Sequence, residues 1–166
     1  MKLIVAANEE WGIGYNGKLL SRIPEDMSFF KEMTTGKAVI MGNSTFKSLP
    51  DAKPLKNRIN IVLSKDTNLR IPGVLVCNSL KDIFYISGMC YKDDIFVIGG
   101  QSIYELLLPY CSIAYVTKFS GSPTQNADRF FPNLDSMPNW KLIKTSETKS
   151  YNEISYNFNI YKNSLT

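Results

Sequence analysis

Histidine is absent from this sequence of 166 residues. The absence excludes nucleophilic triads and dyads in which an imidazole is the base, and every metal site with a histidine ligand. Proton transfer near neutral pH therefore has to use a carboxylate with a perturbed pKa, a tyrosine, a lysine, a cysteine or water.

Cysteine is scarce, with Cys77, Cys90 and Cys111 widely spaced along the chain. An odd number without a close pair argues against a disulfide framework and against a zinc site. We expect three buried or half-buried thiols in a reducing compartment, and no bound metal.

Long apolar runs and blocks of one charge are also missing. No segment approaches the roughly 18 apolar residues of a membrane span. The apolar start at residues 1–7 is too short for a signal peptide and meets Asn8-Glu9-Glu10 at once, so we read it as a strand of a cytoplasmic protein. The net charge of +4 is scattered, whereas nucleic-acid binding usually shows a concentrated basic patch. We expect a monomer with no nucleic-acid or membrane partner.

The overall composition is that of an ordinary globular protein, with 44% hydrophobic and 20% charged residues. The length suits one domain, and we find no linker, repeat or low-complexity segment. We therefore expect a single domain over residues 1–166.

Hydrophobic patterning predicts an α/β fold. Strands are expected at residues 3–7, 38–41, 58–64, 74–77, 94–98, 113–119, 140–148 and 153–161. Helices are expected at residues 24–35, 44–49, 79–86 and 101–108, and a long loop at residues 8–23. Strand and helix alternate in the first two-thirds of the chain, which implies parallel strands, and the last third has strands alone. The expected architecture is a central mixed sheet of about eight strands flanked by helices.

Two turns have the same form of strand, glycine and helix start. Gly42 follows the apolar run 39–41, and Gly99-Gly100 follows the run 96–98. Such a turn lets a ligand approach the backbone closely, and the free N–H groups of the following helix favour an anion. The pair suits a dinucleotide with its pyrophosphate held between the turns. Neither turn is the G-x-G-x-x-G fingerprint, and each alone could be only a tight turn.

Asp26 shares one face of the helix expected at residues 24–35 with Phe30 and Met33. A carboxylate in line with apolar side chains should face a cleft of low dielectric constant, where desolvation raises its pKa. It would also suit a bidentate N–H pattern on a heterocycle. The alternative is an acid that stabilises the first helical turn through the helix dipole, as Glu25 next to it could do.

Eight motifs follow one another in a specific order, at residues 4–7, 11–14, 23–31, 39–46, 54–64, 96–104, 115–117 and 128–132. Together they resemble the dihydrofolate reductase family over nearly the whole chain. The resemblance implies the NADPH-dependent reduction of 7,8-dihydrofolate to 5,6,7,8-tetrahydrofolate, which supports one-carbon metabolism. Hydride would go to C6 of the pterin ring, and N5 would be protonated.

The resemblance also implies roles for residues around the substrate. Asp26 would hold the pterin 2-amino group and N3 and assist protonation of N5 through water, and Thr117 would hydrogen-bond Asp26. Arg58 would pair with the α-carboxylate of the glutamate tail, and Leu55 would pack on the benzoyl ring. The pterin and the nicotinamide would be walled by Val5, Ala6, Phe30, Leu49 and Ile98.

For NADPH, the implied contacts form three groups. The first turn contributes Gly42, Asn43, Ser44 and Thr45, and the second contributes Ile98, Gly99, Gly100, Gln101, Ser102, Ile103 and Tyr104. The nicotinamide end would meet Ala7, Ile13 and Gly14, and the adenosine 2′-phosphate end would meet Leu63, Ser64 and Lys65. The segment 8–23 would be a mobile lid over the nicotinamide.

The chain departs from the family pattern at two places. Leu20-Ser21 stands where many members have Pro-Trp, so a stacking surface is lost, although the Ser21 hydroxyl could hold water. Asn43-Ser44 stands where many members have a basic pair that favours the 2′-phosphate, and Lys47 or Lys65 could compensate.

Two other functions stay open from the sequence. One is the pyrimidine reductase of riboflavin synthesis, which shares the fold and would need a second phosphate-binding cluster in the substrate cleft. The other is a nucleotide-binding module without catalysis, which the missing lid tryptophan would permit and the intact Asp26 argues against.

Overall fold

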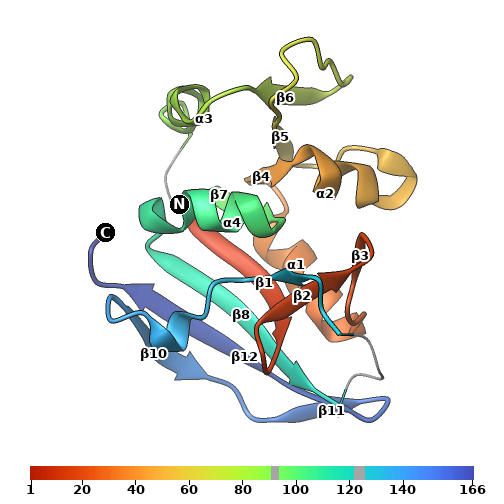
Figure 1. Ribbon diagram of the computed structural model, residues 1–166, viewed down its shortest axis with the longest axis vertical. Helices are drawn as coiled ribbons and strands as arrows, with labels where there is room; N and C mark the ends of the chain where they lie inside the picture. The colour runs from red at the N-terminus through yellow and green to blue at the C-terminus, as the bar shows by residue number, and fades with distance from the viewer. Residues whose placement is uncertain (91–93, 122–125) are drawn as a thin grey trace.

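The computed structural model describes residues 1–90, 94–121 and 126–166. A twisted sheet forms its centre (Figure 1), with the strand order β10-β12-β8-β1-β7-β4-β5-β6 and with β11 paired to β12. The strands are β1 (Lys2–Asn8), β4 (Ala38–Gly42), β5 (Ile59–Leu63), β6 (Val74–Cys77), β7 (Ile95–Gly99), β8 (Ile113–Ser120), β10 (Trp140–Thr145), β11 (Lys149–Tyr151) and β12 (Ile154–Asn163).

The sheet is mixed, as predicted. Neighbouring strands from β8 through β1, β7, β4 and β5 to β6 are parallel, whereas β12 is antiparallel to β8, and β10 and β11 are antiparallel to β12. Helices connect parallel strands because each such crossover must return the chain to the same end of the sheet. They are α1 (Pro24–Thr34), α2 (Asn43–Ser48), α3 (Leu80–Ser87) and α4 (Gln101–Leu107), with short 3₁₀ turns η1 (Pro50–Ala52), η3 (Leu108–Tyr110) and η4 (Leu134–Ser136).

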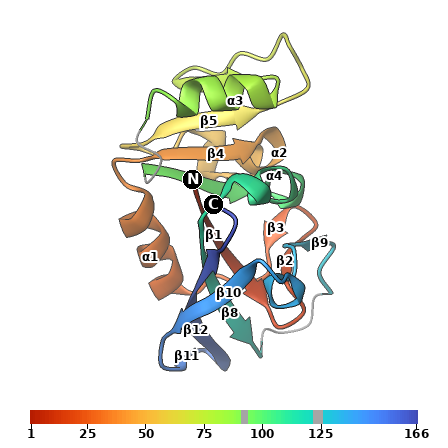
Figure 2. The same cartoon turned by 90° about the vertical axis from the view of Figure 1, so that its left-hand side faces the viewer.

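Both faces of the sheet are covered, so its inner strands are apolar on both sides. In β4, Ala38 and Ile40 enter one core cluster while Val39 and Met41 enter the cluster on the opposite face. Ile103 of α4 packs in the first cluster and Phe30 of α1 against the second. Figure 2 shows α1 and α4 on opposite sides of the strands. This explains the continuous apolar runs, which are typical of parallel strands.

The prediction of one long loop at residues 8–23 is wrong. The segment contains a hairpin of β2 (Gly12–Tyr15) and β3 (Lys18–Leu19), and β2 also pairs with β9 (Arg129–Phe130). Its turn residues Asn16 and Gly17 have φ values of 49° and 74°. Two central residues with positive φ form a type I′ turn, for which Asn-Gly is the strongest sequence signal.

The two strands predicted at residues 140–148 and 153–161 are three. The first strand, β10, ends at Thr145 and has a register shift between Leu142 and Lys144, and β11 then pairs with the start of β12 through a second tight turn. That turn uses Asn152 and Glu153, with φ values of 46° and 66°. The long strand β12 therefore has β8 along one edge, and β10 and β11 in succession along the other.

The three cysteines are free thiols, Cys77 and Cys111 buried and Cys90 half-buried, as predicted. Burial raises the pKa of Cys77 to about 11 and that of Cys111 to about 12, so both stay protonated near neutral pH. None of the described helices is long and apolar enough to cross a lipid bilayer.

Candidate active site

Asp26 lies in the first turn of α1, two residues after the proline that begins the helix. The hydroxyl of Thr117, in the middle of β8, donates a hydrogen bond of 2.6 Å to Oδ1 of Asp26. Thr117 is 2% exposed, so this contact lies against the central sheet. The fold thus joins a helix start and a strand that are 91 residues apart in sequence.

Burial raises the pKa of the Asp26 carboxyl, and the hydrogen bond from Thr117 opposes this to a smaller extent. The direction is the one predicted from the apolar face of the helix, where Phe30 and Met33 pack against the core beside Asp26. Because the neutral form is favoured, this carboxyl can hold a proton at a higher pH than an exposed aspartate can. Asp26, held by Thr117, can therefore bind a heterocycle and supply a proton to it.

Several predicted wall residues surround one apolar cluster on the α1 face of the sheet. Phe30, Leu49, Leu55 and Ile98 are partly buried against this cluster. Ala6 lies on β1 but is packed against a third cluster with Ile23. Val5 is different, because its side chain belongs to the cluster on the opposite face. A substrate on the α1 face would meet the backbone of Val5 and not its side chain.

Arg58 lies beside this apolar cluster, immediately before β5. Its Nη1 donates to the hydroxyl of Thr34 at 2.9 Å, and its guanidinium carbon is 5.9 Å from the centre of the Phe30 ring. Partial burial lowers the pKa of Arg58, but a guanidinium keeps its charge at any physiological pH. The side chain is thus held against α1 with part of its donor fork still available.

Asn60 supports the segment before β5, a role that the sequence analysis did not predict. Its side chain is 3% exposed and bonds both the N–H and the carbonyl of Leu55, each at 2.9 Å, and also the carbonyl of Arg58 at 3.1 Å. One amide therefore fixes the segment that carries Leu55 and Arg58. A buried polar residue inside an apolar strand was the signal that could have identified it.

The two glycine turns lie side by side at the carboxyl ends of β4 and β7, where Met41 is the register partner of Gly99. A Cβ on Gly100 would lie 3.2 Å from Oγ1 of Thr45, so the second turn touches the first helix start. Gly99 has a φ of 108° and joins Gly100 by a cis peptide bond, and a Cβ there would lie 2.8 Å from Cε2 of Tyr104. Neither α2 nor α4 has a side-chain hydrogen bond at its N-cap.

This pair of turns fits a dinucleotide phosphate. The residues present are small or polar at the surface, and Oδ1 of Asn43 is buried without a hydrogen-bond partner among the described residues. Such a polar atom is satisfied by water or by a ligand. Ile103 and Tyr104 lie beneath the turns and are 6% and 4% exposed. Ser44 and Ser102 are exposed at the two helix starts.

Tyr104 links the turns to Asp26. Its hydroxyl donates to the carbonyl of Ile4 at 2.8 Å, and burial first, then the charge of Asp26, raises its pKa above the ordinary range. The hydroxyl therefore stays protonated. Asp26 therefore lies close enough to the second glycine turn for its charge to affect Tyr104 beneath that turn.

The third predicted cofactor group follows β5. Leu63 is half-buried, Ser64 is bonded to β6 through its N–H and the Cys77 carbonyl at 2.9 Å, and Lys65 is exposed. The Ser64 hydroxyl accepts from the N–H of Asp66 at 3.1 Å. The exposed ammonium of Lys65 is therefore the part of this group that could contact a 2′-phosphate on the adenosine.

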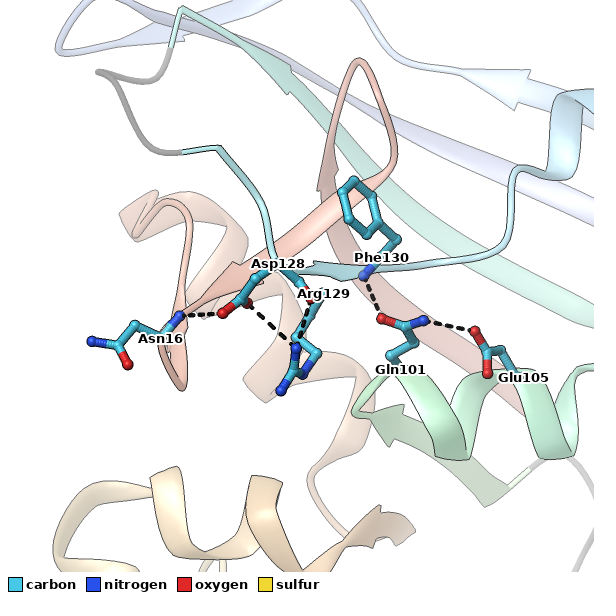
Figure 3. Close-up of polar contacts among 6 residues, drawn as sticks. All are labelled: Asn16, Gln101, Glu105, Asp128, Arg129 and Phe130. Carbon is cyan, nitrogen blue, oxygen red and sulfur yellow. Dashed lines mark hydrogen bonds and ion pairs between the residues drawn. The ribbon is translucent and has the colours of Figure 1, made fainter.

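The hairpin β2–β3 is held over the turns by contacts with the segment 128–131 (Figure 3). Oδ2 of Asp128 accepts from the N–H of Asn16 at 3.0 Å, and Oε1 of Gln101 accepts from the N–H of Phe130 at 2.9 Å. Nε2 of Gln101 donates to Glu105 along α4. Gln101, predicted at the second turn, therefore connects that turn to the hairpin through β9.

Ala7, Ile13 and Gly14, predicted at the nicotinamide end, all belong to β1 and β2. The carbonyl of Gly14 accepts from the N–H of Asp128 at 3.0 Å, while Ala7 and Ile13 pack in the core cluster. No sequence argument gave Asp128 a role, although it belongs to one of the motifs. Nothing near the hairpin in sequence indicates a partner more than 100 residues away.

Ser21, at the family's tryptophan position, has its Oγ buried with no hydrogen-bond partner in the described chain.

Comparison with known proteins agrees with this arrangement. A family model described as dihydrofolate reductase matches residues 1–163. Curated dihydrofolate reductases are similar, one from Bacillus subtilis strain 168 at 39% identity over 153 residues, covering 90% of this chain and 86% of that protein. One from Staphylococcus aureus is 32% identical over 149 residues, covering 90% and 87%. The structure of the Enterococcus faecalis dihydrofolate reductase complexed with NADP(H) and RAB-propyl superposes with a TM-score of 0.82 at 30% identity, covering 98% of this chain and 95% of that one. Because the family model spans residues 1–163 and the curated relatives are up to 39% identical, this chain belongs to the dihydrofolate reductase family.

Proposed function

We propose that this protein reduces 7,8-dihydrofolate to 5,6,7,8-tetrahydrofolate with NADPH, using Asp26 as the group that holds the pterin and its proton. The observation that supports this best is the half-buried Asp26 carboxyl, which accepts a hydrogen bond from Thr117, has a raised pKa and lies on α1 beside an apolar cluster. Family membership supports the same reaction. No observation favours the riboflavin-pathway pyrimidine reductase or a module without catalysis.

Asp26 would bind the 2-amino group and N3 of the pterin, two donors that match the two oxygens of a carboxylate. Thr117 already occupies Oδ1 with a hydrogen bond, which fixes the plane of the carboxylate. The raised pKa makes Asp26 a source of the proton that N5 needs, relayed through a water molecule. The proton lost by Asp26 is replaced from solvent after the product leaves.

The remaining substrate contacts would come from the apolar residues on the α1 face of the sheet and from Arg58 beside them. Phe30, Leu49, Leu55 and Ile98 would pack on the flat rings, and Arg58 would pair with the α-carboxylate of the glutamate tail. Arg58 suits this task because Thr34 and Phe30 hold its guanidinium in place before the substrate arrives. Ala6 and the backbone of Val5 would border the pterin.

NADPH, when bound, supplies the hydride that C6 of the pterin accepts. Its pyrophosphate would lie between the turns at Gly42–Thr45 and Gly99–Ser102, whose backbones a ligand can approach closely. Leu63, Ser64 and Lys65 would hold the adenosine end, and Ala7, Ile13 and Gly14 the nicotinamide end. The hairpin β2–β3 would close over the nicotinamide and exclude water.

Three broader features remain proposals. We propose that residues 1–166 act as a single domain, that the protein works as a monomer in the cytoplasm, and that it has no nucleic-acid or membrane partner. Size-exclusion chromatography with light scattering tests the monomer, which a doubled mass would overturn.

The experiment that tests the function is the loss of NADPH absorbance on adding dihydrofolate to the purified protein, with NADH in parallel. Rapid oxidation that depends on dihydrofolate supports the proposal. The NADPH to NADH ratio then measures how far Asn43-Ser44 has relaxed the choice of cofactor. Tight NADPH binding without oxidation would overturn the proposed reaction.

A further inference from the structure

The residue before Asp26 has its own set of partners on the C-terminal hairpin. Oε2 of Glu25 accepts a hydrogen bond of 2.6 Å from the hydroxyl of Tyr156, and its Oε1 forms an ion pair with Lys149. Tyr156 is 5% exposed on β12, and Lys149 begins β11. These contacts join residues that are 124 and 131 positions apart in sequence.

The two adjacent carboxylates bind two adjacent strands. Asp26 accepts from Thr117 of β8, and Glu25 accepts from Tyr156 of β12. Those strands pair directly, with Thr117 opposite Phe158, two residues beyond Tyr156 along β12. The first turn of α1 is therefore attached to the sheet at two points on neighbouring strands, which fixes its rotation as well as its position.

The start of α1 is held by packing, because Ile23 just before it is 2% exposed in a cluster with Phe119, Ile154 and Tyr156. Its N-cap residue is Ile23, which offers no side-chain hydrogen bond to the first turn. A helix start without such a cap is free to fray unless tertiary contacts replace it. The packing of Ile23 and the polar contacts of Glu25 replace the cap together, and only the Glu25 contacts are polar bonds made by the residue next to Asp26.

The surroundings of Glu25 and Asp26 shift the pKa values of these two acids in opposite directions. The bonds from Lys149 and Tyr156 lower the pKa of Glu25, whereas burial raises that of Asp26. Glu25 therefore stays ionised while Asp26 can take up a proton. Among the described residues, the charge of Asp26 contributes to the raised pKa of Tyr104 on α4 and to that of Tyr156 on β12.

We propose that Glu25 is a positioning residue for the reaction, which holds the first turn of α1 on Tyr156 and Lys149 and so sets the orientation of the Asp26 carboxyl. The inference rests on the proposed function, because it gives Glu25 a role only through Asp26. The bond to the buried Tyr156 is the main component. The ion pair with Lys149 is more than 40% exposed at both side chains and contributes mainly by neutralising Glu25.

The test compares four variants with the wild type in dihydrofolate-dependent NADPH oxidation: Glu25→Leu, Glu25→Gln, Tyr156→Phe and Glu25→Leu with Tyr156→Phe. We expect Glu25→Leu and Tyr156→Phe each to lower kcat about 5- to 10-fold, with the Kd for NADPH changed less than about twofold. The combined variant should be no slower than Glu25→Leu, because both changes remove one bond. Glu25→Gln keeps an acceptor for Tyr156 and should recover most of kcat.

The pH profile supplies a signature that a merely structural role would not produce. In Glu25→Gln the negative charge one residue from Asp26 is removed, so the midpoint of the falling rate should move to lower pH. In Lys149→Met the charge of Glu25 is left uncompensated, and the midpoint should move to higher pH. Each shift should be a few tenths of a pH unit, about what one screened charge produces. The matched control is Lys144→Met on β10. It also removes one lysine charge, but not the one paired with Glu25, and should leave the midpoint of the pH profile unchanged.

Unchanged kcat and unchanged midpoints in folded variants would overturn the positioning role. So would losses of kcat that add in the combined variant, or a fall in melting temperature as the sole effect. A wild type that fails to oxidise NADPH with dihydrofolate would instead overturn the proposed function, and this inference with it. An active wild type with unresponsive variants overturns the inference alone.

Discussion

Thr117 and Asp26 form a hydrogen bond of 2.6 Å between the middle of β8 and the first turn of α1. The bond has two consequences for the carboxyl. It fixes the plane of the carboxyl group, and it partly offsets the increase in pKa that burial causes. Orientation and protonation of Asp26 thus depend on one hydroxyl, which makes Thr117 the most direct place to perturb both.

Replacing Thr117 with valine should shift the pH dependence of hydride transfer to higher pH. The hydroxyl favours the ionised carboxylate, so its loss raises the pKa of Asp26 further, and the acid form persists as the pH rises. The shift should be about half a unit or more, measured in single turnovers between pH 5 and 9. Thr35→Val is the matched control, because among the described residues the Thr35 hydroxyl bonds only the carbonyl of Lys31 at the end of α1. A shift to lower pH would contradict the account.

Replacing Asp26 with asparagine should stabilise the fold near neutral pH while it removes activity. The pKa of Asp26 is raised on folding, so wild-type stability is relatively highest below the unfolded pKa and is lost as the pH rises through the folded value. The variant should therefore melt higher at pH 8, by roughly 2–4 °C for each kcal/mol gained, and the difference should vanish in acid. Melting curves between pH 4 and 8 measure this, and a variant that is less stable than the wild type at pH 8 would contradict a raised pKa for Asp26 in the folded protein.

Replacing Arg58 with leucine should weaken dihydrofolate binding by about 2–5 kcal/mol, the usual cost of removing one partner of a hydrogen-bonded charge pair. NADPH binding should not change. Arg70→Leu is the matched control, because the Arg70 guanidinium bonds only carbonyls of its own loop among the described residues. Isothermal titration with dihydrofolate and with a pterin fragment that lacks the glutamate separates the outcomes. Equal losses for both ligands would show that Arg58 does not bind the tail.

Replacing Asp128 with alanine should loosen the hairpin β2–β3. The change removes the acceptor for the N–H of Asn16, the contact by which a side chain of the segment 128–131 holds the hairpin tip. We expect kcat to fall about tenfold and the rate of NADPH release to rise, since one charge-assisted bond of roughly 1.5 kcal/mol is lost. Asp51→Ala, at another exposed aspartate, is the control. Stopped-flow release of NADPH at the wild-type rate would exclude the closing role.

The sequence predicted those features that local patterns determine. Asp26 with Phe30 and Met33 is a helical face, and Gly42 and Gly99 each follow an apolar strand, so both arrangements can be read within a dozen residues. The turn at Asn16-Gly17 carried an equally local signal for a hairpin. That signal was overlooked because the surrounding residues alternate poorly and the strands are short.

Long-range partners could not be predicted in this way. The pairing of β2 with β9 and the bonds from Tyr156 to Glu25 and from Thr117 to Asp26 all depend on how the sheet brings distant segments together. A single asparagine or glutamate has many possible partners of similar energy. The one that forms is decided by the packing of the apolar strands, which fixes the positions of the polar groups.

The most direct test of the account is the single-turnover rate of NADPH oxidation by dihydrofolate at pH 7 in Asp26→Asn, with the Kd for NADPH measured on the same protein. Glu32→Gln, on the exposed face of the same helix, is the control. The account predicts a rate at least about 100-fold below wild type, the usual contribution of a positioned acid, with a Kd within about twofold. A rate close to that of the wild type would contradict it.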